Sequence, residues 1–159
     1  RRTESDIDSI CSALGDKSDF RICKGIYLEP DDIAHTKYSE IVGATNSAVT
    51  SMLDRGAYTA IASHDLPVIE HALAELRNRG LTDSRSTGLE KKGPGYEFQF
   101  LLGVRGDVRR SLASKGHLTR VYVPYGTRWY EYGIRRLREN PEVASHVVKA
   151  LLMPWTNRR

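Results

Sequence analysis

The sequence predicts an α/β fold built on a parallel sheet, and three observations support this. Four short apolar segments, typical of buried strands, alternate with segments in which apolar residues recur at helical spacing. Glycine or proline stands at most of the boundaries. The chain has 159 residues, 40% hydrophobic and 28% charged, as in one globular domain of ordinary size. Regular alternation of strand and helix implies parallel strands joined by right-handed crossovers.

The N-terminal part of the chain is predicted to hold three helices and two strands. Gly15 and Gly56 end the first two helices, and Pro67 suits the first turn of the third. Short apolar runs between the helices predict the strands. In order, we expect a helix over 3–14, a strand over 20–27, a helix over 37–55, a strand over 58–62 and a helix over 67–79.

A polar connection over 80–95, rich in Gly, Ser, Thr, Asp and Lys, leads to the second part of the chain. Gly116 ends the helix that follows the third strand, and Pro124 breaks the fourth strand. The expected elements are a strand over 97–104, a helix over 107–115, a strand over 119–123, and helices over 129–138 and 141–152.

These observations do not decide whether the sheet closes into a barrel or remains an open sheet. A repeat of roughly 35 residues fits the unit of a (β/α) barrel, which needs eight units, and four are present here. An open, doubly wound sheet of four strands satisfies the same pattern. The first strand is not followed by a G-x-G-x-x-G turn, which counts against a dinucleotide-binding domain.

Charge and cysteine content exclude several classes of function. The formal net charge is +4, with both signs interspersed, so we expect no nucleic-acid partner. Two cysteines are too few for a disulfide framework or a closed zinc site, so no metal is expected. No apolar run approaches the ~18 residues of a membrane-spanning helix.

Polar residues follow the first two predicted strands, where α/β proteins place their chemistry. Arg21, Lys24 and Gly25 lie near the end of the first strand. Ser63 and His64 follow the second and are available for a ligand if Asp65 caps the next helix. The alternative for Arg21 and Lys24 is that each forms an ordinary ion pair with an acidic side chain.

The third and fourth strands add further candidates. Glu97 is expected to be a structural carboxylate paired with an arginine or lysine, and Cys23 to be buried and inert. Tyr132, Arg135 and Arg136 lie on one predicted helix after Tyr122, and two adjacent arginines suit a carboxylate ligand. The alternative is a solvated helix face.

Four blocks of the sequence, in order between residues 20 and 152, resemble the proline dehydrogenase family. FRICKGIYLEP resembles its R-x-x-K-G-A-Y strand and IASHD its A-T-H segment. YEFQFLLGV resembles its F-E-F-Q-x-L-x-G strand, and RVYVPYGTRWYEYGIRRLRENPE its V-R-V-Y-V-P-Y-G-x-x-W-x-x-Y-x-x-R-R ending. Ile26 replaces the usual alanine and Ser63 the usual threonine.

The resemblance implies the second half, strands five to eight, of a distorted (β/α)8 TIM-type barrel. Residues 1–159 would form part of a single barrel domain whose first half is absent from this chain. The implied reaction is oxidation of L-proline to Δ1-pyrroline-5-carboxylate by hydride transfer to FAD. The alternative is a catalytically silent flavin- or carboxylate-binding module.

The resemblance also implies roles for individual residues. Arg21 would lie against the reactive flavin nitrogen as the catalytic residue. The other implied contacts are Lys24, Gly25, Ile26, Ser63 and His64 with FAD, Arg135 and Arg136 with the proline carboxylate, and Tyr122 and Tyr132 beside the substrate. Implied partners are a quinone-type electron acceptor and the N-terminal half of the barrel, in the same or a separate chain. The implied location is cytoplasmic, with peripheral contact at the inner membrane left open.

Overall fold

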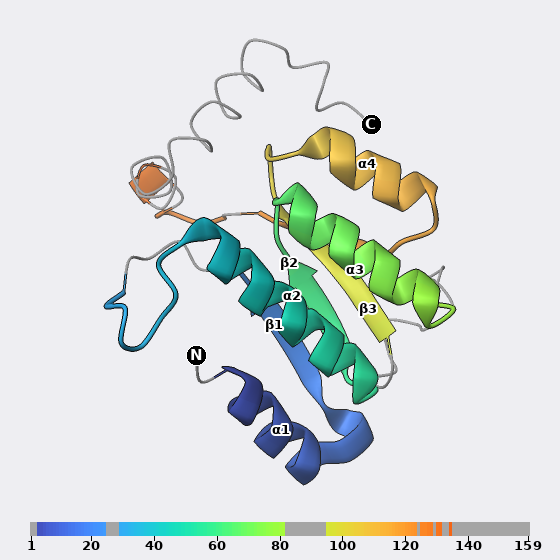
Figure 1. The fold of residues 1–159 in the computed structure, drawn as a ribbon. Helices are drawn as coiled ribbons and strands as arrows, with labels where there is room; N and C mark the ends of the chain where they lie inside the picture. The colour runs from blue at the N-terminus through green and yellow to red at the C-terminus, as the bar shows by residue number, and fades with distance from the viewer. Residues whose placement is uncertain are drawn as a thin grey trace.

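The computed structural model describes residues 3–24, 29–81, 95–123, 125–128, 130–131 and 134 (Figure 1). Strands and helices alternate along these residues, as the sequence predicts. The elements are α1 (Thr3–Leu14), the 3-10 turn η1 (Gly15–Lys17), β1 (Asp19–Cys23), α2 (Tyr38–Asp54), β2 (Tyr58–Ala62), α3 (Leu66–Asn78), β3 (Gly95–Leu101), α4 (Gly106–Ser114) and β4 (Thr119–Tyr122).

The described strands form one parallel sheet in the order β1-β2-β3-β4. The prediction of an α/β fold with a parallel sheet is therefore confirmed. Each new strand is added on the same side of the last, so right-handed crossovers carry the helices to one face. A doubly wound sheet instead reverses this direction and has helices on both faces. The sequence is compatible with a (β/α) barrel or with an open, doubly wound sheet. The sequential strand order favours the barrel-type arrangement.

The hydrophobic core lies between the helices and the face of the sheet that they cover. In Figure 1, α2 and α3 lie in front of the sheet. Tyr96, Phe98 and Phe100 alternate along β3 and are at most 2% exposed. They pack with a set of aliphatic side chains from the strand β2 and the three helices: Val49, Leu53, Ile61, Val68, Ile69, Ala72, Leu76 and Leu112. The helix α1 adds Ile7 against α2 and β1. Alternation of strand residues thus directs the apolar side chains toward the helix layer.

Some predicted boundaries were wrong. β3 begins at Gly95 and ends at Leu101, whereas the prediction was 97–104. The chain turns after Leu101, because Gly103 has a φ of 83° and the Val104 N–H donates to the Leu101 carbonyl. β1 ends at Cys23, and residues 25–27 of its predicted range lie outside the described residues. The connection over 82–94, the helix at 141–152 and most of that at 129–138 also lie outside them.

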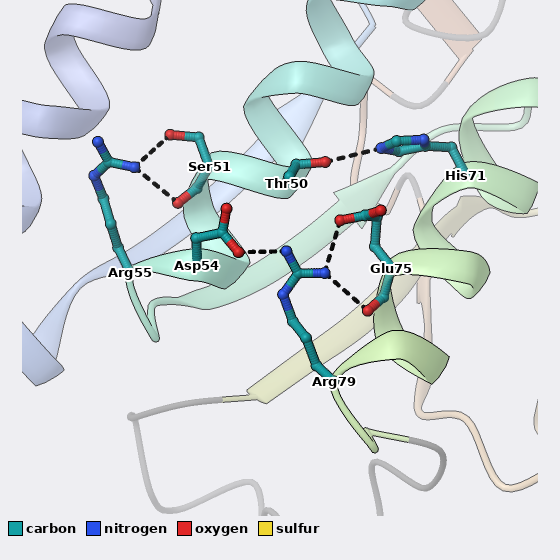
Figure 2. A network of polar contacts seen from close by, with 7 residues as sticks. All are labelled: Thr50, Ser51, Asp54, Arg55, His71, Glu75 and Arg79. Carbon is teal, nitrogen blue, oxygen red and sulfur yellow. Dashed lines mark hydrogen bonds and ion pairs between the residues drawn. The ribbon is translucent and has the colours of Figure 1, made fainter.

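Polar contacts fasten α2 to α3 on the outer surface (Figure 2). Thr50 and His71 share a hydrogen bond of 2.9 Å. The Arg79 guanidinium, at the end of α3, donates to Asp54 of α2 and to Glu75 at 2.7 Å. The hydrogen bond with Asp54, followed by that with Glu75, raises the pKa of Arg79 against the opposing effect of burial. These contacts fix the relative position of the two helices, although exposed ion pairs add little stability.

The opposite face of the sheet carries polar side chains in register. Glu97 of β3 is only 2% exposed, although it is ionisable. Its carboxylate accepts two hydrogen bonds of 2.7 Å from Arg120 and one of 3.0 Å from Tyr58. Gln99 donates a further one at 2.5 Å. The expectation that Glu97 is paired with a cation is confirmed.

These contacts determine the protonation states of Glu97 and Tyr58. Burial alone would raise the pKa of Glu97, but the hydrogen bonds from Arg120, Gln99 and Tyr58 and the charge of Arg120 hold it below its usual value. Burial, together with the hydrogen bond to Glu97, raises the pKa of Tyr58 well above its usual value. Glu97 is therefore ionised at neutral pH, and the Tyr58 hydroxyl keeps its proton.

We predict that Phe98→Ala lowers the free energy of unfolding by about 3–5 kcal/mol, because it removes a fully buried ring and leaves a cavity. Urea titration of the purified protein measures this. Leu102→Ala is the control, since Leu102 is 60% exposed and a surface truncation should change stability by about 0.5 kcal/mol or less. Equal losses from both variants would contradict the location of the core.

We predict that Glu97→Gln lowers the free energy of unfolding at pH 7 by about 2 kcal/mol, because it weakens charge-assisted hydrogen bonds. The pKa of Glu97 is lowered in the folded state, so its stabilisation is complete above the unfolded pKa and is lost as pH falls through the folded value. The difference between wild type and variant should therefore shrink below about pH 4.

Urea titrations from pH 7 to pH 3 check this, with Glu70→Gln as the matched control because Glu70 is exposed. A difference between wild type and Glu97→Gln that stays constant over that range would contradict the assignment of Glu97 as an ionised, buried anchor.

Candidate functional site

The candidate site lies where the carboxyl ends of the strands meet. The register pairs Cys23 with Ala62, and Leu101 with Tyr122, so the ends of β1 to β4 share one edge. Arg21, Lys24, Ser63, His64 and Tyr122 all lie at this edge or on the polar face that leads to it. Five other predicted site residues lie outside the described residues: Gly25, Ile26, Tyr132, Arg135 and Arg136.

Arg21 lies on the polar face of β1. Its Nε donates to the Gln99 side-chain oxygen at 2.6 Å, and one terminal nitrogen contacts the Cys23 sulfur. Within the described part of the chain, Arg21 forms no ion pair with a carboxylate, so its charge is not cancelled by a neighbour. Cys23 is exposed, and the expectation that it is buried was wrong, because the odd-numbered residues of β1 face away from the helices.

Lys24 is already paired. Its ammonium group forms a short ion pair with Asp65 and lies 4.4 Å from the centre of the Tyr38 ring, a cation–π distance. The Tyr38 hydroxyl donates to the same carboxylate at 2.8 and 3.0 Å. These three side chains tie the end of β1 to the start of α2 and of α3. The alternative of an ordinary ion pair therefore holds for Lys24 and not for Arg21.

Asp65 does not cap α3 with its side chain, contrary to the expectation. It occupies the N-cap position, but its carboxylate bonds Lys24 and Tyr38 instead. The Ser63 hydroxyl accepts from the Asp65 N–H at 3.1 Å and holds the turn into the helix. A positive charge competes for a carboxylate more strongly than a backbone N–H does. The Asp65 carboxylate therefore binds Lys24, and the Ser63 hydroxyl accepts the hydrogen bond at the start of the helix.

His64 also has a structural contact. Its Nε2 accepts a hydrogen bond of 2.9 Å from the Leu101 N–H, and its ring lies 5.8 Å from that of Phe100. A nitrogen that accepts cannot carry a proton, so the imidazole is neutral with its proton on Nδ1. Ser63 and His64 thus fix the ends of β2 and β3, and their contact with a cofactor stays a prediction.

Tyr122 is half exposed on the polar face of β4, two residues after Arg120. The cluster formed by Arg21, Tyr58, Glu97, Gln99 and Arg120 precedes it along this face. From the sequence we expected Glu97 to be paired, but Tyr38, Tyr58 and Arg120 were not among the candidates. Alternation along the strands was the available signal for Tyr58 and Arg120, while nothing marked Tyr38.

Other kinds of site are not found in the described residues. They contain no group of three or more His, Cys, Asp or Glu side chains that could hold a metal ion. Among the helices described, none is long and apolar enough to cross a membrane. A hollow of about 680 Å³ lies beside β1 and α2 and is lined by Ile22, Ile41 and Ala48, among others.

The sequence is similar to a known family and to proteins that belong to it. A model of the proline dehydrogenase family matches residues 15–149. Proline dehydrogenase of Deinococcus radiodurans is 33% identical over 147 residues, which cover 88% of this chain and 44% of that protein. Proline dehydrogenase 2 of Bacillus subtilis strain 168 is 33% identical over 150 residues, or 94% of this chain and 45% of that protein.

The chain therefore spans a little under half the length of these relatives. The family match, in contrast, runs through β1 to β4 and includes the polar face and the strand ends described above. The chain belongs to the proline dehydrogenase family.

Proposed function

We propose that this chain supplies strands five to eight of a distorted (β/α)8 barrel that oxidises L-proline to Δ1-pyrroline-5-carboxylate with FAD. Membership of the family and the names of its relatives support the reaction. The sequential parallel sheet, with its helices on one face, supports the barrel. The chain spans about 45% of the relatives' length, so the other half of the barrel would come from the same or a separate polypeptide.

The observation that carries the proposal is the position of Arg21. A guanidinium group that no described carboxylate neutralises lies on the polar face of the sheet, which a closed barrel would enclose. A flavin ring gains negative charge when it is reduced, and an uncancelled positive charge stabilises that charge. The residues present therefore fit a flavin, and Arg21 would contact its reactive nitrogen.

The remaining FAD contacts would come from the strand ends. Lys24, Gly25 and Ile26 follow β1, while Ser63 and His64 follow β2 and precede the N-terminus of α3. Because Asp65 balances the charge of Lys24, Lys24 contributes donors more than net charge. Arg21 is then the main cationic influence on the flavin from the described part of the chain.

FAD, when bound, supplies the hydride acceptor. Arg135 and Arg136 would hold the proline carboxylate with charge-assisted hydrogen bonds and fix the ring toward the cofactor. Tyr122, half exposed on the polar face, and Tyr132 would pack beside the substrate ring. The residues of this chain thus bind, orient and provide positive charge.

The electron acceptor and the location follow from the same family resemblance. We propose a quinone-type acceptor and a cytoplasmic location, with peripheral contact at the inner membrane as the place where electrons leave. Co-sedimentation with vesicles of bacterial lipid, with and without proline, tests the membrane contact.

We predict that L-proline bleaches bound flavin in the protein that contains the complete barrel, under anaerobic conditions. Arg135→Ala combined with Arg136→Ala should reduce kcat/KM at least 100-fold, mainly through KM, because the carboxylate loses both charged partners. Stopped-flow absorbance measures the bleaching, and Arg77→Ala, on the exposed outer surface of α3, is the control.

Flavin that binds but is never bleached by proline would contradict the dehydrogenase proposal. That outcome would favour a catalytically silent flavin- or carboxylate-binding module.

We also predict that the rate of flavin reduction rises about tenfold per pH unit below the pKa of the substrate amine, because only the neutral amine can release hydride. Single-turnover measurements at saturating proline from pH 6 to pH 9 check this. A rate that is independent of pH over that range would show that loss of the amine proton does not limit the reaction.

A further inference from the structure

Arg21 reaches its partner across an intervening strand. Arg21 of β1 is in register with Ala60 of β2, and Ala60 is in register with Glu97 of β3. Gln99, the hydrogen-bond partner of Arg21, lies two residues further along β3 on the same face. Strands two apart in a sheet are separated by about 10 Å, so the arginine side chain must extend over the middle strand. Ala60 has only a methyl group there, and it is 4% exposed.

The amide of Gln99 has a defined orientation. Its oxygen accepts from Arg21 Nε at 2.6 Å, and its nitrogen donates to Glu97 at 2.5 Å. The reversed amide would place an NH₂ group against a guanidinium and an oxygen against a carboxylate, so only one orientation satisfies both neighbours. Gln99 therefore connects Arg21 to a buried anchor with a fixed direction.

The anchor itself is held from several sides. Two hydrogen bonds from Arg120 and one from Tyr58 fix the Glu97 carboxylate, which is almost fully buried. The charges of Glu97 and Arg120 cancel as a pair. Gln99 is neutral, so the connection orients Arg21 without removing its positive charge. A glutamate at position 99 would form an ion pair with Arg21 and cancel that charge, and it would also lose the hydrogen bond that Gln99 donates to Glu97.

We propose that Gln99 is a positioning residue that fixes the Arg21 guanidinium while leaving its charge available, and that the small side chain of Ala60 keeps the path open. The proposal rests on the proposed function, because the role of Arg21 beside a flavin belongs to it. Gln99 acts through Arg21 and need not touch the cofactor.

The test compares Gln99→Met, Gln99→Glu and Ala60→Val in the protein that contains the complete barrel, with FAD for the first readout and without it for the second. Gln99→Met breaks the connection between Arg21 and Glu97. Gln99→Glu keeps the contact with Arg21 and cancels its charge, but it replaces the hydrogen bond to Glu97 with a second carboxylate beside it. Ala60→Val obstructs the path while leaving Gln99 unchanged. Tyr58→Phe is the matched control, because it removes one hydrogen bond to Glu97 and keeps the one between Gln99 and Arg21. Arg21→Met gives the effect of losing the cation altogether.

Two readouts separate positioning from a general structural effect. The first is the midpoint potential of the bound flavin, measured by reduction with dithionite and independent of proline. Gln99→Met and Gln99→Glu should each weaken the preference for reduced flavin about tenfold, which corresponds to about 30 mV more negative for two electrons. Tyr58→Phe should leave the potential within about a third of that shift.

The second readout is the exchange of the Arg21 Nε–H proton by ¹⁵N NMR, measured without FAD. The proton should be protected in wild type, Tyr58→Phe and Gln99→Glu, and unprotected in Gln99→Met and Ala60→Val.

A double variant tests whether the two residues act together. In the Arg21→Met background, Gln99→Met should not change the midpoint potential of the flavin further, since Gln99 acts through Arg21.

A potential that is unchanged in both Gln99 variants, while Arg21→Met lowers it, would overturn the proposal. Protection of the Arg21 proton in Gln99→Met would overturn it as well. Failure of the proposed function looks different, because wild-type protein would then show the protected proton but no bleaching of flavin by proline.

Discussion

The structure depends on a buried carboxylate. Glu97 lies almost fully buried on the face of the sheet opposite the helices, and an ionised group there is tolerated only if every oxygen has partners. Arg120, Gln99 and Tyr58 supply them from three strands, so the anchor also joins β2, β3 and β4. Arg21 extends the connection to β1 through Gln99. A polar cluster on this face thus links all four described strands.

The two faces of the sheet have different roles, because one packs against the helices and the other carries the polar cluster. Alternate residues of β3 point to opposite sides: Phe98 and Phe100 pack under the helices, while Glu97 and Gln99 face away. The apolar face stabilises the fold by burial, whereas the polar face arranges charge. In our proposal, the second face is the interior of a barrel and the charge of Arg21 is directed at a flavin. Lys24, by contrast, is paired with Asp65 and holds the loops together.

The sequence predicted the fold class and most elements well, because glycines, prolines and apolar spacing mark them locally. Gly15 ends α1 with a positive φ, as expected, and Glu97 proved to be paired. The end of β3 was misjudged because Leu102 and Val104 continue the apolar run beyond a turn that Gly103 makes. The role of Asp65 was misjudged because its partner Lys24 lies 41 residues away in the sequence. Register between strands, which no local pattern encodes, also decided that Arg21 contacts Gln99.

In our proposal, the polar face of this sheet holds a flavin against Arg21. The most direct measurement is a crystal structure of the protein with its complete barrel and FAD bound. We expect the flavin ring on the side of the sheet opposite α2 and α3, with its reactive nitrogen within hydrogen-bond distance of the Arg21 guanidinium and with Gln99 still bonded to Arg21. A flavin bound elsewhere, or a guanidinium turned away from it, would contradict the proposal.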